Sequence, residues 1–320
     1  MSARGIALLS ALLAAPAVAN DTTAVLGAGG LVPTVAATVR IEDEELSVAP
    51  SEIVVRYRFR NTAAEPLSTI VAFPLPEIDL ATLAETPINP GGHDPDDFVD
   101  FRVTVDGAPV RPAIEMRAWR HGSEVTEVLR RHGIPVSRFH PDQYPRLRAQ
   151  PPAARVALRA AEIASWEDHD NVYPLWIMRA QYHWRQTFPA GRPLAVEHRY
   201  RPVVGDSAIG TYLLNESDEA QAWRARFCVD AATRETLRRM VAAAPADNPY
   251  RRLRTIAYVL TTARNWQGPI GRFRLTLDRE RPEAILVTCF PGLAPDGPTG
   301  HSVERRDFLP DAELEVAIID

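Results

Sequence analysis

Two short acidic stretches contain groups of side chains that could bind a metal ion. In the first, four carboxylates follow a histidine within eight residues: His93, then Asp94, Asp96, Asp97 and Asp100. Hard oxygen ligands at such close spacing are typical of calcium sites. The second stretch, Trp166–Asp170, has acidic side chains and a histidine that could bind a metal ion in the same way. Neither has the central glycine and terminal glutamate of an EF-hand loop, so solvated acidic loops are the favoured interpretation, with the four aspartates of the first stretch as weak metal-ligand candidates.

A second candidate is a row of guanidinium groups. Arg56, Arg58 and Arg60 alternate with Val55, Tyr57 and Phe59, which is the period of a half-buried strand. The three arginines therefore lie on one face of the predicted strand. Such a row suits carboxylate or phosphate groups, such as those of anionic envelope polymers. The alternative, which we favour, is a solvated strand face that has no partner.

Trp266 is a third candidate, because it lies in the turn-like sequence Asn265–Ile270. An exposed indole there would form a platform on which a sugar ring could stack. The same residue could equally anchor a Gly-Pro turn on the hydrophobic core. We favour the core anchor and retain the binding platform as the alternative.

The motifs that define common catalytic sites are absent from the sequence. All 36 Lys+Arg residues are arginine, which excludes Schiff-base chemistry and the P-loop lysine. Neither a G-x-S-x-G elbow nor an H-E-x-x-H helix is present. His198 alternates with Val196 and Tyr200, which is typical of a core histidine rather than of a catalytic base. We therefore assign no catalytic residue and no cofactor, and a hydrolase is the least favoured class.

The N-terminus has the pattern of a secretory signal peptide. Arg4 precedes an apolar stretch over 6–15, and Ala17-Val18-Ala19 has the small residues of a cleavage site. Cleavage after Ala19 would leave Asn20 as the first residue of the mature chain. No cysteine follows that site, so a lipoprotein anchor is not expected, and no later segment has the ~18 apolar residues of a spanning helix. The expected location is periplasmic or secreted.

Two cysteines, Cys228 and Cys289, follow the predicted cleavage site. An even pair in an oxidising compartment predicts a disulfide, and no CxxC pair or Cys/His zinc spacing competes with it. Each cysteine is next to a phenylalanine in a segment that we expect to be partly buried. Two buried free thiols are the alternative.

The hydrophobic pattern predicts a mainly β fold with inserted helices, of the β-sandwich type and α+β overall. Alternation of apolar residues predicts strands over 55–61, 99–105, 182–188 and 194–200, and further strands are expected over 68–73, 258–262, 273–277, 285–290 and 314–319. Helical spacing predicts a helix capped by Ser123, another over 151–165 and a third after Asp230. We expect a signal peptide over 1–19, an N-terminal β-sandwich domain over 20–205 with a helical insertion at about 117–168, and a C-terminal β-rich domain over 206–320 with one or two helices.

Several long motifs resemble the bacterial domain-of-unknown-function family 4424. They are the start of the mature chain at 20–30, the segment 54–76 with its FPLP, QTFPAGRPLAVEHRYRPVVG at 186–205, FCVDAATR at 227–234 and YVLTTARNWQGPIGRFRL at 258–275. The resemblance implies an exported bacterial protein of β-rich fold and carries no activity with it. Within the motifs, YRFRN…FPLP is also similar to the vault/inter-alpha-trypsin type of β-domain, which would favour an interaction role. The DxSxS signature of the adhesion domain usually linked to it is absent.

The net charge of the chain restricts the kinds of partner that the protein is expected to bind. The formal net charge of −5 argues against a nucleic-acid binder that works by neutralising phosphates. We therefore expect a non-catalytic exported protein that binds another protein or an envelope component. A carbohydrate- or metal-binding module is the second interpretation.

Overall fold

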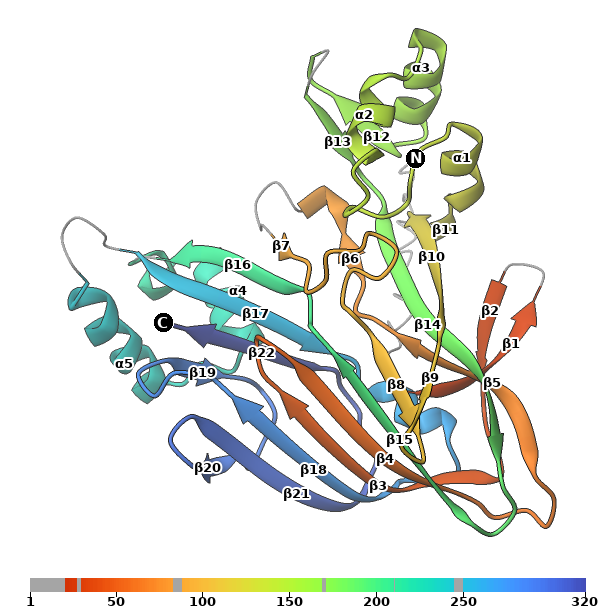
Figure 1. The fold of residues 1–320 in the computed structure, drawn as a ribbon. Helices are drawn as coiled ribbons and strands as arrows, with labels where there is room; N and C mark the ends of the chain where they lie inside the picture. Colours follow the sequence, from red (N-terminus) through yellow and green to blue (C-terminus); the bar gives the residue numbers. More distant parts are fainter. Residues whose placement is uncertain (1–20, 28–29, 83–87, 169–170, 210, 245–249) are drawn as a thin grey trace, which may run out of the picture.

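The computed structural model describes residues 21–27, 30–82, 88–168, 171–209, 211–244 and 250–320. The predicted cleavage residues Ala19 and Asn20 lie outside this range. Strands are the main regular structure of the described chain, with short helices between them (Figure 1). The prediction of a mainly β fold with inserted helices is therefore confirmed.

The largest sheet has eight strands in the described part of the chain. Their order is β20 (Ala294–Asp296), β21 (Gly300–Phe308), β18 (Ile270–Asp278), β3 (Val39–Val48), β4 (Ile53–Asn61), β15 (Pro193–Tyr200), β8 (Arg102–Val105) and β9 (Ala108–Val110). Neighbouring strands are antiparallel except for β3 and β18, which are parallel. The β8–β9 turn uses Asp106 and Gly107, both with positive φ, as expected for an Asp-Gly hairpin.

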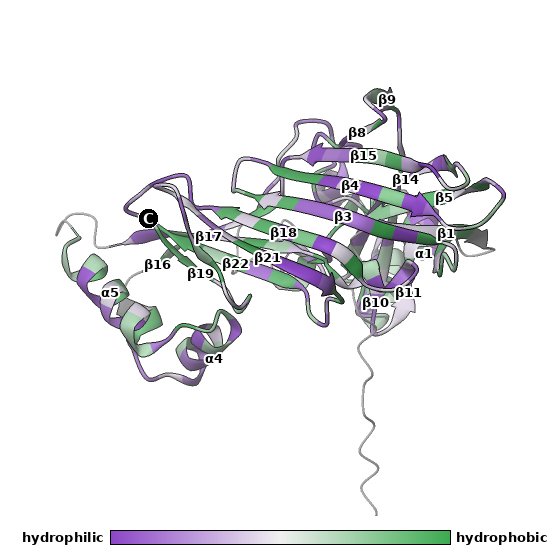
Figure 2. Cartoon of the chain, turned by 90° about the horizontal axis from the view of Figure 1, so that it is seen from below, coloured by the Kyte–Doolittle hydropathy of each residue, from purple (hydrophilic) through white to green (hydrophobic). Residues whose placement is uncertain are grey.

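The alternating sequence of β4 determines which of its faces is buried. Val55, Tyr57 and Phe59 are buried, whereas Arg56 and Arg58 are exposed. Figure 2 shows this alternation as hydrophobic and hydrophilic bands along β3 and β4. The predicted strand is confirmed because period two places every second side chain on the core face.

A seven-stranded sheet packs on the inner face of the eight-stranded one. It runs β11 (Ser123–Glu124), β10 (Ala113–Arg120), β14 (Ile177–Phe188), β5 (Leu67–Pro74), β1 (Thr22–Gly27) and β2 (Gly30–Thr34), and β6 (Ile78–Asp79) also pairs with β14. Aromatic contacts join the two sheets: the ring centroids of Phe59 and Phe188 are 5.5 Å apart, and those of Phe73 and His198 are 5.0 Å apart. The main hydrophobic core therefore lies between these sheets.

A third sheet carries two helices on one face. It runs β19 (Ile285–Val287), β22 (Leu314–Ile319), β17 (Arg251–Tyr258), β16 (Val204–Ile209) and β7 (Ile88–Asn89). Helices α4 (Asp218–Arg226) and α5 (Ala231–Ala242) lie beside it (Figure 2). The Asp230 side chain caps α5 by accepting the Thr233 N–H at 2.7 Å, as the sequence predicted. Phe227 and Leu237 form a second, smaller core with the sheet.

The helical insertion differs in detail from the prediction. It contains α1 (Thr126–Arg131), α2 (Gln143–Arg148), α3 (Pro152–Ala160) and a hairpin of β12 (Ala164–Trp166) and β13 (Val172–Pro174). The prediction that Ser123 caps a helix is wrong, because Ser123 lies in β11 and pairs with Arg120. The helix begins at Thr126, whose hydroxyl accepts the Ala118 N–H at 2.9 Å.

The predicted strand over 258–262 is also wrong. Strand β17 ends at Tyr258, and a 3-10 helix, η3 (Thr261–Asn265), follows. The Glu313 carboxylate accepts the backbone N–H groups of Leu260 and Thr261, at 2.7 and 3.2 Å. These bonds replace the ladder bonds that a longer strand would need. Two shorter 3-10 helices, η1 (Leu80–Thr82) and η2 (Thr211–Leu214), connect other elements.

Strands from both sides of the predicted boundary near residue 205 share one sheet. β18 pairs with β3, and Phe273 and Leu275 of β18 belong to the same core as Tyr57 and Phe59. The boundary at 205/206 therefore does not separate two independent cores. Within the described residues, no helix combines the length and the apolar character needed to cross a membrane.

Candidate functional site

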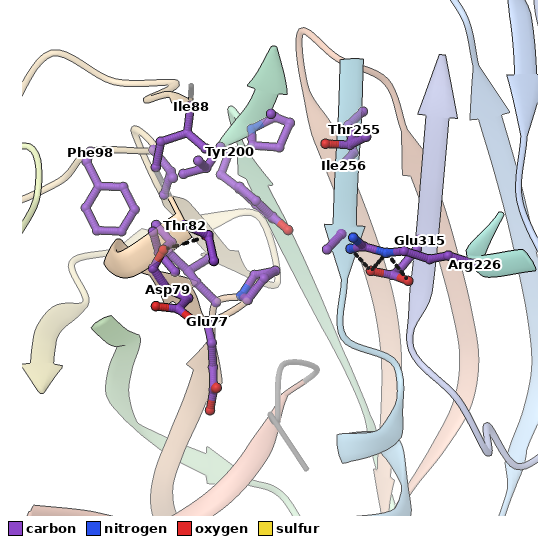
Figure 3. Close-up of a pocket in the computed structure, with 18 of the residues that line it drawn as sticks. Glu77, Asp79, Thr82, Ile88, Phe98, Tyr200, Arg226, Thr255, Ile256 and Glu315 are labelled. Atoms are coloured by element: carbon purple, nitrogen blue, oxygen red, sulfur yellow. Dashed lines mark hydrogen bonds and ion pairs between the residues drawn. The ribbon is translucent and has the colours of Figure 1, made fainter. Parts of the chain in front are cut away.

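A cleft of about 270 Å³ opens between the β5–β6 region and the face of β17 (Figure 3). One wall includes Leu75 and Ile78, and Phe98 lies beside them. The opposite wall is formed by Thr255, Ile256 and Ala257, with Arg226 and Glu315 next to them. The cleft therefore lies where the third sheet meets the sandwich.

Tyr200 contributes the polar group between the two walls. It ends β15, and Figure 3 shows its hydroxyl directed toward the space between them. The residue is only 3% exposed. Burial raises the pKa of the Tyr200 hydroxyl, since the phenolate would be poorly solvated, and the neutral group can donate or accept a hydrogen bond.

Three of the four charged side chains that line the cleft in the described chain are in ion pairs, and the fourth, Asp79, accepts the Ala81 backbone N–H at 3.0 Å. The Arg226 Nε donates to both oxygens of Glu315, at 3.1 Å each. These bonds raise the pKa of the Arg226 guanidinium, although its burial opposes them. Glu77 pairs with Arg179 at 2.6 Å. The cleft thus combines an apolar surface with charges that are mostly paired, which suits binding better than proton transfer.

A buried polar cluster lies in the core behind β15. His198 and Asp21 are fully buried, and the His198 Nε2 is 3.4 Å from the Asp21 Oδ2. The Tyr57 and Tyr258 hydroxyls are 3.3 Å apart in the same core. Burial lowers the pKa of His198 to about 3. Burial, and then the charge of Glu44, raise the pKa of Asp21. His198 therefore lies inside the core and does not face the cleft.

The arginine row on β4 is neutralised by acids on the adjacent strands. Arg56 Nε is 2.7 Å from the Glu197 carboxylate on β15. Arg58 pairs with Asp43 on β3, and Arg60 pairs with Glu42 and donates to the Gly191 carbonyl. The hydrogen bonds from Arg60 and Arg40 lower the pKa of the Glu42 carboxyl, although desolvation opposes them. The row is therefore part of an ionic ladder across the outer face of the sheet.

Trp266 lies in the core and is 2% exposed. Its ring packs on Phe59 and Phe188, with centroids 4.7 and 5.6 Å away. Its indole N–H donates to the Asp21 carbonyl. The side chain is therefore covered by protein on the described chain and offers no open face to a sugar.

The aspartates of the first acidic stretch mostly shape their own loop. The Asp97 Oδ1 accepts the Phe101 N–H at 2.9 Å and the Tyr182 hydroxyl, and the Asp94 Oδ1 accepts the Asp96 N–H at 2.9 Å. Asp100 lies 3.3 Å from Arg201. Within the described ranges, no three His, Cys, Asp or Glu side chains are grouped so that they could hold a metal ion.

Cys228 and Cys289 form the predicted disulfide, with Cα atoms 5.0 Å apart. The two segments are partly buried as expected, with Phe227 buried and Phe290 half-buried, whereas the cysteines themselves are exposed. The bond joins the α4–α5 connection to the chain just beyond β19.

The residues of the cleft were not found from the sequence. Arg226 and Glu315 are 89 residues apart, and neither belongs to a motif. The alternation in β15 identified Tyr200 as a core-facing position, but gave no sign that its hydroxyl reaches a cleft. Only the folded arrangement of three sheets brings these groups together.

Comparison with known proteins identifies the family. Residues 19–317 match the model described as "Domain of unknown function (DUF4424)". The chain therefore belongs to this family, and the resemblance seen in its motifs is confirmed. No curated protein matches the chain. A solved structure from Legionella pneumophila, described as a "putative nutrient binding protein", is similar over 89% of this chain and 68% of that one, with 13% identity and a TM-score of 0.42. A TM-score this low does not establish a shared fold.

Proposed function

We propose that the protein is an exported, non-catalytic binding protein of the bacterial envelope, and that its cleft receives side chains of a polypeptide partner. The observation on which this rests is the cleft itself, which combines an apolar surface, the Tyr200 hydroxyl and charges of which most are already paired. Its volume is about 270 Å³. Pockets for small molecules usually span about 300–1,000 Å³, whereas one or two anchor side chains fit a smaller space.

Two features support the exported location. The N-terminal sequence has a charged residue, an apolar stretch and small residues before Asn20. The Cys228–Cys289 disulfide is of the kind that persists in oxidising compartments. Both agree with a role outside the cytoplasm.

Cross-linking in intact cells tests this proposal. A photo-reactive residue at Val203, which lines the cleft, should capture a specific protein. The same residue at Ala208, which is exposed on the adjacent β16 and outside the cleft, is the matched control. Ala257→Trp should fill the cleft and reduce capture at Val203 about tenfold or more, as expected for blocking an anchor pocket.

The same cells test the location. Mass spectrometry should find a mature chain that begins at Asn20 in the periplasmic or secreted fraction. Equal capture from both positions, or unchanged capture by a folded Ala257→Trp variant, contradicts the role of the cleft. A pool found only in the cytoplasm contradicts export.

A further inference from the structure

A second hollow lies next to the cleft, between residues 31–33 of β2 and residues 115–119 of β10. Its volume is about 240 Å³, and Leu75 and Glu77 line both this hollow and the cleft. Figure 3 shows Glu77 at the edge of the cleft. The two spaces therefore meet along one short segment, and a chain that occupied the cleft could continue into the second hollow.

The four charged side chains that line the second hollow in the described chain form two ion pairs. Glu77 lies 2.6 Å from Arg179, and Arg117 lies 3.1 Å from Glu115. Arg179 also lies over the ring of Trp119, 4.3 Å from its centre. A charged group that entered the hollow would lose its water without gaining a free partner of opposite charge. The second hollow therefore suits an uncharged occupant.

The β1–β2 hairpin adds an exposed apolar surface at this place. Val25 and Val32 are paired across the hairpin and are 51% and 49% exposed, and Val35, just after β2, is 68% exposed. Six large hydrophobic side chains are exposed in the described chain, and these valines are three of them. Exposed apolar side chains gathered on one short segment indicate a binding surface. Val32 also lines the second hollow, so the two features form one surface.

The free edge of β2 offers hydrogen-bond acceptors to the second hollow. Among the described strands, β2 is the last of its sheet and pairs with β1 alone. The Leu31 N–H points away from β1, because it donates to the Glu115 carboxylate at 3.4 Å. In an antiparallel strand the N–H and C=O of one residue point to the same side, and residues two apart share that side. The carbonyls of Leu31 and Pro33 therefore point away from β1 as well.

These two carbonyls select the kind of partner. Pro33 has no N–H and the N–H of Leu31 is already bonded, so these two positions accept hydrogen bonds and have no donor left. The β2 strand of a second copy would bring the same acceptors without donors, which disfavours pairing of β2 with itself. An extended polypeptide of different sequence brings an N–H to the same side at every second residue, about 7 Å apart, which matches the spacing of the two carbonyls.

We propose that the polypeptide partner is bound as one extended, uncharged segment that runs from the cleft into the second hollow and adds a strand to the free edge of β2. The segment presupposes that the cleft binds a polypeptide, and so depends on the function proposed above. One of its apolar side chains fills the cleft, and a second lies against Val32 and Trp119. Its backbone N–H groups donate to the carbonyls of Leu31 and Pro33.

Cross-linking at two positions in the same cells tests the continuous segment. A photo-reactive residue at Val32 should capture the same protein as one at Val203, and Ala257→Trp should reduce capture at both positions. Mass spectrometry should place the two captured sites within about ten residues of each other, since an extended chain of that length spans ~33 Å. A photo-reactive residue at Val156, which is 68% exposed on α3 and lies outside both spaces, is the control and should not capture this protein.

A reciprocal substitution tests whether the second hollow contributes to binding. Val32→Asp places a carboxylate in the apolar part of the hollow, and it should reduce capture at Val203 about tenfold or more, as expected for the loss of an anchor. Val156→Asp adds the same charge elsewhere and should leave capture at Val203 unchanged. Thermal unfolding verifies that both variants are folded, and the mapping of captured sites does not depend on either of them.

The outcomes separate the continuous segment from the role of the cleft. Capture at Val203 without capture at Val32 leaves the role of the cleft intact and overturns the continuous segment. A different protein or a second copy of this chain at Val32, captured sites far apart in the partner, or unchanged capture at Val203 by a folded Val32→Asp variant overturns it as well. Failure of capture at both positions contradicts the role of the cleft itself, and the continuous segment with it.

Discussion

Asp21 and His198 form a buried pair whose protonation states depend on each other. Burial favours the neutral form of both groups, so the pKa of Asp21 is raised and the pKa of His198 is lowered to about 3. In the unfolded chain an aspartate titrates near 3.9 and a histidine near 6.5. Between those values the unfolded pair holds one proton, on His198, whereas burial in the folded protein favours neutral His198 and shifts Asp21 toward its protonated form. The two effects on stability therefore offset each other in the wild type.

Replacing Asp21 should remove this compensation. In the Asp21→Asn variant only His198 titrates, and its stabilising effect is complete above pH 6.5 and lost as the pH falls toward 3. Between pH 7 and pH 5, the free energy of unfolding of this variant should fall by about 2 kcal/mol, whereas that of the wild type should fall less. Urea unfolding at both pH values measures this difference.

A double variant provides the control for this prediction. Asp21→Asn combined with His198→Gln removes both titrating groups, and its extra pH dependence should disappear. An Asp21→Asn variant whose stability does not fall between pH 7 and pH 5 would contradict the assignment of neutral His198 in the core.

At the scale of single residues, the sequence predicted which way a side chain faces better than it predicted which residue that side chain contacts. Alternation placed His198 inward and Arg56 outward, because period two follows directly from backbone geometry. It could not show that Glu197 neutralises Arg56, since that pair depends on the register between β4 and β15. Asp21 belongs to the motif at 20–30, but no periodicity in the sequence marked it as a buried residue. Its burial follows from contacts with Trp266 and His198, which are distant in sequence.

At the scale of elements, the disulfide fixes the α4–α5 pair to the third sheet. Cys228 ends the segment that carries Phe227 into the smaller core, and Cys289 follows β19. The sequence separation of 61 residues makes the loop closed by this bond long. In the chain-entropy model, the bond therefore removes much of the freedom of the unfolded chain.

Replacing both cysteines by serine should lower the free energy of unfolding by about 2–4 kcal/mol. Because both cysteines are exposed, dithiothreitol should reach the bond in the native protein and give a similar loss. Denaturant unfolding with and without reductant measures both effects. The serine variant should not respond to the reductant, and a wild-type protein that is insensitive to it would contradict a stabilising disulfide.

The sequence predicted the ends of helices and strands only where a hydrogen bond between residues close in the sequence determines the end. Asp230 caps α5 through a hydrogen bond to a backbone group three residues away, so the sequence alone was sufficient. Ser123 had the same local signal but lies in β11, because pairing with β10 competes with capping. Tyr258 ends its strand because Glu313, far along the chain, binds the next backbone groups. Long-range partners of this kind leave no periodic trace in the sequence.

At the scale of the whole molecule, the two halves of the chain complete one core. The parallel pairing of β3 with β18 places Phe273, Leu275 and Leu277 among the residues of the first half. Arg272 also binds Asp43 at 2.7 Å across this junction. A linear division at residue 205 followed from the change in sequence pattern, but a pattern along the chain does not show which strands become neighbours.

A fragment of residues 20–205 should therefore not fold by itself. Without 206–320, β3 becomes an exposed edge strand, and Phe59 loses Trp266 while Tyr57 loses Tyr258. Truncation of one large aromatic core side chain costs about 3–5 kcal/mol. The fragment loses several core side chains of this size, and the summed loss exceeds the ~5–15 kcal/mol stability of a typical domain. The fragment should show no cooperative thermal transition and should bind a hydrophobic dye, while the 20–320 chain unfolds cooperatively under the same conditions. A sharp transition in the fragment would instead show that the N-terminal half is an independent domain and that β18 is dispensable to it.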